Sequence, residues 1–161
     1  MTENSEQENL QTDLVYALAC TPDVDICFSA RGSGLYRSED GGKTWESVYD
    51  SLNFAEPLPT TSIVLSPDIG IDAGAFAGVP GGVMKSTDAG KNWEVTGLAS
   101  PPPMVAAMAI SPNYVEDGVV FVGSSEDGVF RSASRGSSWS RWNFGLLDLT
   151  AYCFAISPNY A

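Results

Sequence analysis

The stretch SEDGGKTW, residues 38–45, decides the fold of the chain because it recurs at a fixed spacing. A second copy, STDAGKNW, occupies residues 86–93, and a third, SASRGSSW, occupies residues 132–139. The tryptophans that end the copies are 48 and 46 residues apart. A catalytic site is normally built once, whereas a structural device is copied with its repeat. The spacing therefore indicates a repeat protein with a period of about 46 residues.

A second marker keeps the same rhythm. The turns TPD (21–23), SPD (66–68), SPNY (111–114) and SPNY (157–160) have prolines 45, 45 and 46 residues apart. Short apolar segments surround these turns, and their lengths and alternation predict strands. The expected first strands are 14–20, 62–65, 105–110 and 152–156; the second strands are 26–30, 74–78 and 119–123; the third strands are 34–38, 82–86 and 128–132. The tryptophan of each recurrent stretch is predicted to open a fourth strand.

Four short antiparallel strands in every 40 to 50 residues are typical of a β-propeller blade. The motif S-x-D-x-G-x-x-W resembles the Asp-box, or BNR repeat, of sialidases, xyloglucan-cleaving glycoside hydrolases, sortilin-type receptors and the photosystem II assembly factor. The resemblance implies an all-β fold of four-stranded propeller blades, three of them complete, followed by the first strand of a fourth. Residues 1–12 are expected to form a flexible acidic tail and residues 13–161 a partial propeller, with blades at 13–58, 59–103 and 104–148 and the start of another at 149–161.

Three blades do not close a typical propeller, which leads us to expect a fragment of a longer protein that carries the remaining blades. A second copy of the chain is the alternative. Two copies would supply six blades but would leave two spare first strands with unpaired edges.

In the resembled families the box forms the hairpin between the third and fourth strands of a blade. Glycine there adopts the positive φ of a tight turn, the serine and aspartate side chains accept hydrogen bonds from turn amides, and the tryptophan packs into the sheet. A calcium or substrate site is disfavoured because Ser134 replaces the third aspartate. The expected structural residues are Ser38, Asp40, Gly42, Trp45, Ser86, Asp88, Gly90, Trp93, Ser132, Gly136 and Trp139.

The resemblance also implies where a ligand would bind. The boxes and the proline turns would share one face, and the opposite face, formed by the turns between second and third strands and by the connections between blades, is where propellers usually bind ligands. The candidate binding residues on that face are Arg31, Asn53, Phe54, Glu56, Glu126, Asp127, Asn143, Phe144 and Asp148.

No catalytic residues are assigned. A sialidase needs three converging arginines, but of the five in this chain Arg37 and Arg131 flank boxes at equivalent positions, where Lys85 stands in the middle repeat. A xyloglucanase would use two carboxylates, and nothing singles out one pair among the candidates. We therefore expect a binding or scaffold module for a protein or carbohydrate partner. The alternative is a sialidase-like or xyloglucanase-like glycoside hydrolase whose catalytic residues lie partly outside this chain.

Composition limits the partners further. The formal net charge of -12 opposes a phosphate backbone, so nucleic acid is not an expected partner. No apolar run reaches the length of a membrane span, and the absence of a recognisable secretion signal favours a cytoplasmic location. The chain has no histidine and no CxxC spacing, and we expect neither a metal nor a cofactor. Cys20, Cys27 and Cys153 are expected to be buried free thiols, with a Cys20–Cys27 bridge as the alternative for an exported protein.

Overall fold

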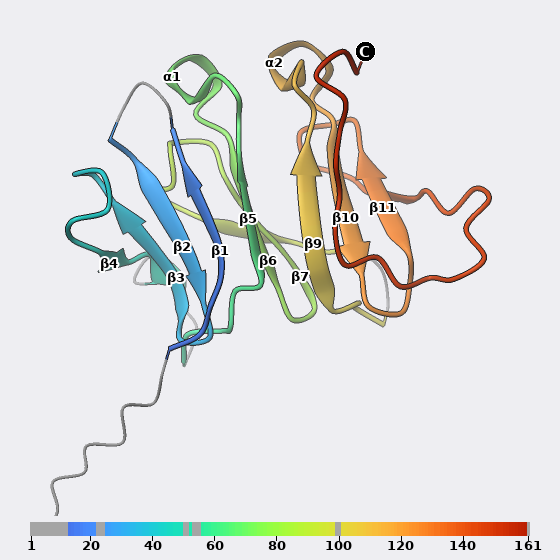
Figure 1. The fold of residues 1–161 in the computed structure, drawn as a ribbon, viewed down its shortest axis with the longest axis horizontal. Helices are drawn as coiled ribbons and strands as arrows, with labels where there is room; N and C mark the ends of the chain where they lie inside the picture. The colour runs from blue at the N-terminus through green and yellow to red at the C-terminus, as the bar shows by residue number, and fades with distance from the viewer. Residues whose placement is uncertain (1–12, 22–24, 50–51, 53–55, 99–100, 161) are drawn as a thin grey trace, which may run out of the picture.

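The chain folds into three four-stranded antiparallel sheets, as the computed structural model in Figure 1 shows. It describes residues 13–21, 25–49, 52, 56–98 and 101–160. The strands are β1 (Val15–Cys20), β2 (Cys27–Arg31), β3 (Gly34–Ser38) and β4 (Glu46–Ser47) in the first sheet; β5 (Ser62–Leu65), β6 (Ala75–Val79), β7 (Gly82–Ser86) and β8 (Glu94–Thr96) in the second; and β9 (Val105–Ile110), β10 (Val120–Ser124), β11 (Val129–Ser132) and β12 (Ser140–Arg141) in the third. Each sheet pairs its strands in chain order. The prediction of an all-β fold made of propeller blades is confirmed.

The three blades lie side by side, with their first strands β1, β5 and β9 next to one another (Figure 1). Apolar side chains fill the spaces between the blades. Phe28 and Trp93 belong to the core shared by blades 1 and 2, and Phe76 and Phe130 belong to the core shared by blades 2 and 3. Burying an aromatic side chain of this kind contributes on the order of 2–3 kcal/mol. The blades are therefore held together by the same kind of contact at each junction.

A helical turn that the sequence patterns did not predict follows the second proline turn, and another begins at the last residue of the third. Helix α1 spans Ile69–Asp72 and helix α2 spans Tyr114–Asp117. Each ends at a residue in the left-handed conformation, Ala73 and Gly118 respectively, whose amide bonds back to the first helical carbonyl. Within the described residues, no helix has the length and apolar character needed to cross a bilayer.

Several strand bounds differ from the prediction: each second strand lies one residue later than predicted, and two further differences concern the fourth strands and the last segment. The fourth strands begin one residue after each tryptophan, so Trp45 precedes β4 instead of opening it. The segment 152–156 is extended along blade 3 but is not paired as a strand. It packs there through Phe154 and Ile156, against a small core that includes Phe121. Residues 149–160 thus lie against the third blade as the predicted start of a fourth would.

The expectation of buried free thiols is wrong. Cys20 and Cys27 form a disulfide between β1 and β2, with their Cα atoms 4.1 Å apart, and Cys153 is exposed. The two paired cysteines are direct cross-strand partners at the end of the hairpin. Apolar neighbours in the sequence suggested burial, but β1 lies at the open end of the array and Cys20 is exposed there.

Candidate functional site

The turns between second and third strands and the connection between the first two blades lie at one end of the sheets. The turn that joins β2 to β3, after Arg31, lies at the opposite end from the box that follows Ser38, because Arg31 pairs with Gly34 and Cys27 pairs with Ser38. The connection from blade 1 to blade 2 reaches the same end, since the amide of Thr60 donates to the carbonyl oxygen of Arg31 at 2.9 Å. The turns and the connections therefore form one surface, away from the boxes.

Arg31 is engaged by its own blade. Its Nε donates to the Ser29 hydroxyl at 2.8 Å, and its Nη1 lies 3.8 Å from a carboxylate oxygen of Asp13. Its guanidinium also stacks over the rings of Tyr36, at 4.5 Å, and Trp45, at 5.4 Å. These contacts fix the guanidinium against the two aromatic rings.

A second polar cluster lies on blade 3. Asp127 forms an ion pair with Arg141, with an N–O distance of 2.9 Å. Asn143 joins the cluster, since its Nδ2 donates to the Asp127 carbonyl oxygen at 3.1 Å and its Oδ1 accepts the amide of Val129 at 2.7 Å. Asn143 therefore organises the turn between β10 and β11. Of the predicted binding residues, Asp127 and Asn143 are brought into direct contact.

The remaining candidates are dispersed around these two clusters. Glu56 and Glu126 are exposed, and the Phe144 ring is 89% exposed. Asp148 accepts the amide of Thr150 at 2.8 Å, and hydrogen bonds from the hydroxyl and amide of Thr150 hold the pKa of Asp148 below its usual range. Asn53 and Phe54 lie outside the described residues.

The box side chains are used in their own turns. In the first box, Asp40 Oδ1 accepts the amides of Lys43 and Thr44, both at 2.9 Å, and Ser38 Oγ accepts the amide of Gly42 at 2.8 Å. Hydrogen bonds to Asp40, led by the one from the Thr44 hydroxyl, hold the pKa of its carboxyl far below the usual range. These polar groups close the hairpin and leave the box little free capacity for a ligand.

The second box repeats this pattern and the third adapts it. Burial works to raise the pKa of Asp88, but hydrogen bonds from Asn92, Ser86 and Lys91 outweigh it and lower that pKa. In the third box, Ser134 Oγ accepts the Ser138 amide at 2.9 Å, so the hydroxyl replaces one carboxylate oxygen. Only the second box tryptophan, Trp93, is buried; the other two are half-buried.

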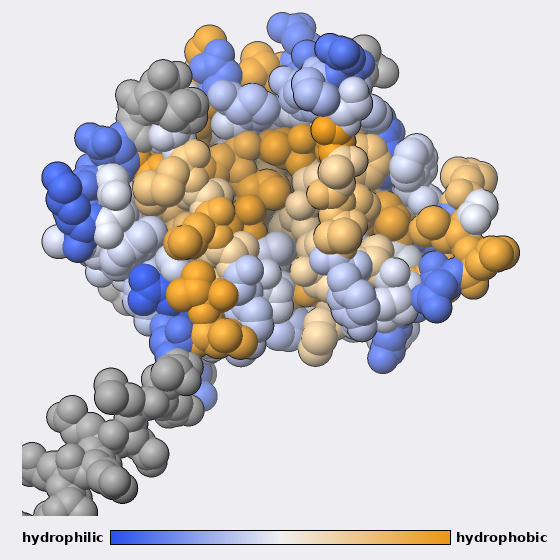
Figure 2. Space-filling view, in the orientation of Figure 1, coloured by the Kyte–Doolittle hydropathy of each residue, from blue (hydrophilic) through white to orange (hydrophobic). Residues whose placement is uncertain are grey.

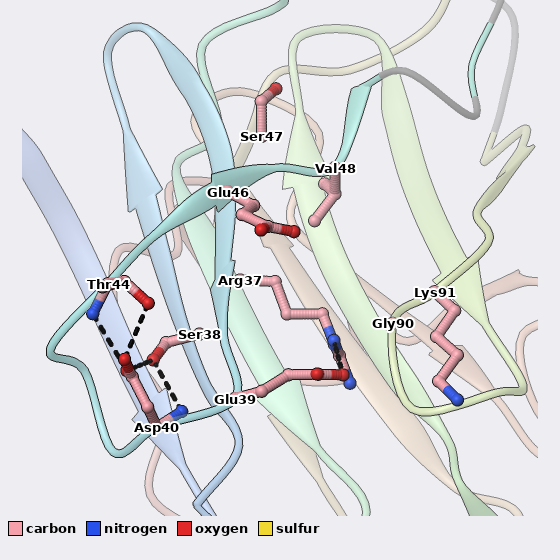
Figure 3. A pocket seen from close by; sticks show the side chains of 10 residues that line it. All are labelled: Arg37, Ser38, Glu39, Asp40, Thr44, Glu46, Ser47, Val48, Gly90 and Lys91. Carbon is pink, nitrogen blue, oxygen red and sulfur yellow. Dashed lines mark hydrogen bonds and ion pairs between the residues drawn. The ribbon is translucent and has the colours of Figure 1, made fainter.

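A cavity that the sequence did not reveal lies on the box side, between the first two boxes (Figure 3). It has a volume of about 610 Å³ and charged side chains on its walls. Arg37 crosses it, since Nε donates to the Ala89 carbonyl oxygen at 2.9 Å and Nη1 pairs with Glu39. The side chains that line it are Arg37, Ser38, Glu39, Asp40, Thr44, Glu46, Ser47, Val48 and Lys91, with the backbone of Gly90.

A smaller hollow of about 180 Å³ repeats this arrangement on the second blade. Lys85 and Glu94 line it, and they stand where Arg37 and Glu46 stand in the first blade. The one sequence signal for both hollows is the basic residue before each box. Since the hollow recurs with the blade, it follows from the repeat rather than from a unique site. Among the described residues, no three acidic or cysteine side chains are grouped so as to hold a metal ion.

The repeated box hairpins and the four-stranded sheets define the class: the chain folds as β-propeller blades whose box hairpins are similar to the BNR/Asp-box repeat. The family model described as BNR/Asp-box repeat matches residues 36–47. The chain is 34% identical over 74 residues to the Neosartorya fischeri protein named "Probable oligoxyloglucan-reducing end-specific xyloglucanase". That match covers 44% of this chain and 9% of the relative.

Solved structures share the fold. An ancestral GH74 enzyme superposes with a TM-score of 0.66 at 22% identity, covering 80% of this chain and 18% of that one. GH74 from Niastella koreensis gives 0.64 at 19% identity, covering 89% and 24%. The structure of YCF48 bound to a D1 peptide superposes with a TM-score of 0.62 at 16% identity, covering 80% of this chain and 40% of that one. The chain thus spans less than half the length of each of these similar proteins.

Proposed function

We propose that the chain is a binding module, and that it recognises a carbohydrate or protein partner through the surface around the Asp127–Arg141 pair. The observation that carries the proposal is the apolar loop that follows β12. Phe144 is 89% exposed and Leu147 is fully exposed, and Trp142, which follows Arg141 in the sequence, is 47% exposed. The loop forms an orange projection at the right-hand edge of Figure 2. Exposed apolar clusters beside polar groups are typical of interaction surfaces.

The polar groups beside this loop suit recognition better than catalysis. Arg141 holds Asp127 in an ion pair, and Asn143 uses both of its amide atoms in the turn. A glycosidase needs one carboxyl group that donates a proton and a second that acts as base or nucleophile. The Asp127 carboxylate is already engaged by Arg141, which disfavours it in either of these roles. The aromatic and charged groups together would instead contact the apolar and hydroxyl faces of a bound partner.

A glycoside hydrolase is the second candidate, and the partial match to the xyloglucanase-named relative supports it. In this function Glu56, Glu126, Asp127 or Asp148 would supply a carboxylate, and other residues would come from outside the chain.

For the location, the Cys20–Cys27 disulfide supports an oxidising compartment over the cytoplasm.

The two candidates are separated by titrating the full chain with xyloglucan oligosaccharides and sialosides while product release is followed. We expect binding without turnover. Phe144→Ala should weaken binding by about tenfold, the loss of one aromatic contact. Val95→Ala, which trims an apolar side chain that is 51% exposed on β8, should leave binding unchanged. Turnover that Glu126→Gln or Asp127→Asn abolishes would establish the hydrolase, and binding equal in Phe144→Ala and the parent would exclude this surface.

A further inference from the structure

The cavity between the first two boxes lies at the junction of two four-stranded sheets. One wall comes from blade 1, and the facing wall comes from Gly90 and Lys91 in the second box. Its shape is therefore set by the contact of two neighbouring blades and not by either end of the array. Its volume of about 610 Å³ is in the range of small-ligand sites. None of its lining residues belongs to the surface around the Asp127–Arg141 pair.

The equivalent hollow of blade 2 has its charges paired. Lys85 on β7 and Glu94 on β8 are direct cross-strand partners, and Lys85 Nζ lies 3.6 Å from a carboxylate oxygen of Glu94. This hollow has a volume of about 180 Å³. The basic residue before the box thus neutralises the acidic residue that opens the fourth strand.

Blade 1 has charged residues at the same two positions but pairs them differently. Arg37 and Glu46 are cross-strand partners, yet the Arg37 guanidinium forms its ion pair with Glu39. Glu39 has no acidic counterpart in the other two boxes, where Thr87 and Ala133 occupy that offset. Glu39 therefore diverts the arginine. As a result, Glu46 lines the cavity without an ion pair to any described residue.

Lys91 supplies the opposite charge on the facing wall. Figure 3 shows it on the loop of the second box, across the hollow from the strand that carries Glu46. The hydrogen bond and charge of Arg37 hold the pKa of Glu39 below its usual range, and the charge of Lys91 adds to this lowering. Lys91 itself belongs to no ion pair of the described residues. The cavity thus presents one carboxylate and one ammonium group, on different walls, that are not paired.

The remaining walls restrict the kind of ligand further. Asp40 and Ser38 use their oxygens to close the first box, so they offer little to a ligand. Val48 is the one apolar side chain among the lining residues, and it is buried. An apolar ligand would therefore bury little surface here. A ligand that suits these walls has charged ends and a short apolar middle.

We propose that this cavity binds a small zwitterion, a molecule with an ammonium group at one end and a carboxylate at the other. The ammonium group pairs with Glu46, the carboxylate pairs with Lys91, and the chain between them lies along Val48. Spaced amino acids and short peptides with free termini share this chemistry. An ion pair at an exposed site is weak by itself, so both pairs are needed together.

The test titrates the full chain with ω-aminobutanoate, ω-aminohexanoate and ω-aminooctanoate, which differ in the separation of their charges, and follows the backbone amide signals by NMR. We expect at least one of them to bind, with shifts at Glu46 and Lys91. Hexylamine and hexanoate carry one charge each and should bind about fivefold more weakly or worse. Absence of binding by all three amino acids, or equal binding by a singly charged probe, would overturn the proposal.

A peptide probe identifies the source of the zwitterion. Triglycine has as many chain atoms between its charged groups as ω-aminooctanoate has. Tighter binding of triglycine would support a peptide ligand, and tighter binding of ω-aminooctanoate would support an aliphatic amino acid.

Matched variants locate the site. Glu46→Gln and Lys91→Gln change exposed side chains, so both should melt like the parent, and each should weaken binding of the zwitterion about fivefold. Glu46→Gln should not weaken binding of hexanoate, which has no ammonium group. Lys43→Gln, at the offset of Lys91 in the first box, and Glu94→Gln, at the position of Glu46 in blade 2, are the controls and should leave binding unchanged. Equal weakening by the controls and by the site variants would overturn the proposal, since binding would then follow net charge alone.

Discussion

Phe28 of the first blade meets Trp93 of the second edge-on, with ring centroids 5.9 Å apart and an interplanar angle of 83°. The tryptophan nitrogen also donates to the Gly90 carbonyl oxygen at 3.1 Å, which fixes the ring within its own box. One side chain therefore closes a hairpin and joins two blades. This relationship decides which tryptophan matters most for stability.

Trp93→Ala should cost about 3–5 kcal/mol of unfolding free energy, because it removes a buried aromatic side chain from the junction. Trp45→Ala should cost distinctly less, since that ring is half-buried and no blade among the described residues packs on that side. Urea unfolding of both variants compares them directly. Equal losses would mean that the box tryptophan acts within its own blade alone.

Glycine substitutions separate backbone strain from collision. Gly42 and Gly90 both have positive φ, +89° and +79°, so alanine at either position costs about 1 kcal/mol in backbone strain. Gly90→Ala in addition drives a methyl group into the Phe28 ring, and we expect a further loss of about 1–3 kcal/mol. Melting curves of the matched pair give the difference. If the two variants have the same melting temperature, the packing around Phe28 rearranges at little cost to admit the methyl group.

Replacing Ala89, an alanine with left-handed backbone conformation, should stabilise the second box. Ala89 has a φ of 58°, and in the first box the equivalent residue is Gly41. Ala89→Gly should raise stability by about 0.5–1 kcal/mol, because glycine adopts this conformation without strain and keeps both backbone hydrogen bonds. Ala106→Gly, in β9, is the control and should lower stability. A loss of stability in both variants would refute the argument from φ.

The carboxylates of Asp40 and Asp88 make the free energy of unfolding depend on pH. The folded pKa values of Asp40 and Asp88 are lowered, so their contribution is present above the unfolded value of about 3.9 and is lost as the pH falls through the folded pKa values. Ser134→Asp should add a third such group, raising stability at pH 7 and steepening the loss towards pH 2. Chemical unfolding at a series of pH values would show both effects. Ala133→Asp, at the exposed position next to it, should show neither.

Much of the fold could be predicted from local patterns. The predicted segments 62–65 and 105–110 coincide with β5 and β9, and the three boxes mark the ends of the third strands. Spacing reports such features because a strand and its turn are encoded within a few residues. The disulfide was missed because cross-strand register and the exposure of β1 depend on which blades stand beside it.

The candidate site was predicted less completely. Alignment of the repeats placed Asp127, in a turn between strands, and Asn143, in a connection between blades, on the same face, and the structure shows their contact. The partnership of Asp127 with Arg141 was not predicted, because the two meet only once β12 has paired with β11. The cavity beside Arg37 was not predicted for a similar reason, since the residues of its walls belong to two blades and are far apart in the sequence.

The paired phenylalanine and glycine at each junction also bear on how such a chain can change length in evolution. The Phe28 ring of the first blade packs against Gly90 of the second, and the Phe76 ring packs against Gly136 one repeat later. Each of these blades thus presents a phenylalanine on one face and a box glycine on the other. A gene duplication or deletion spanning one whole period would again set a phenylalanine against a glycine, without a compensating mutation. A recombination that broke the period would set two phenylalanines or two glycines against each other, and selection would remove it.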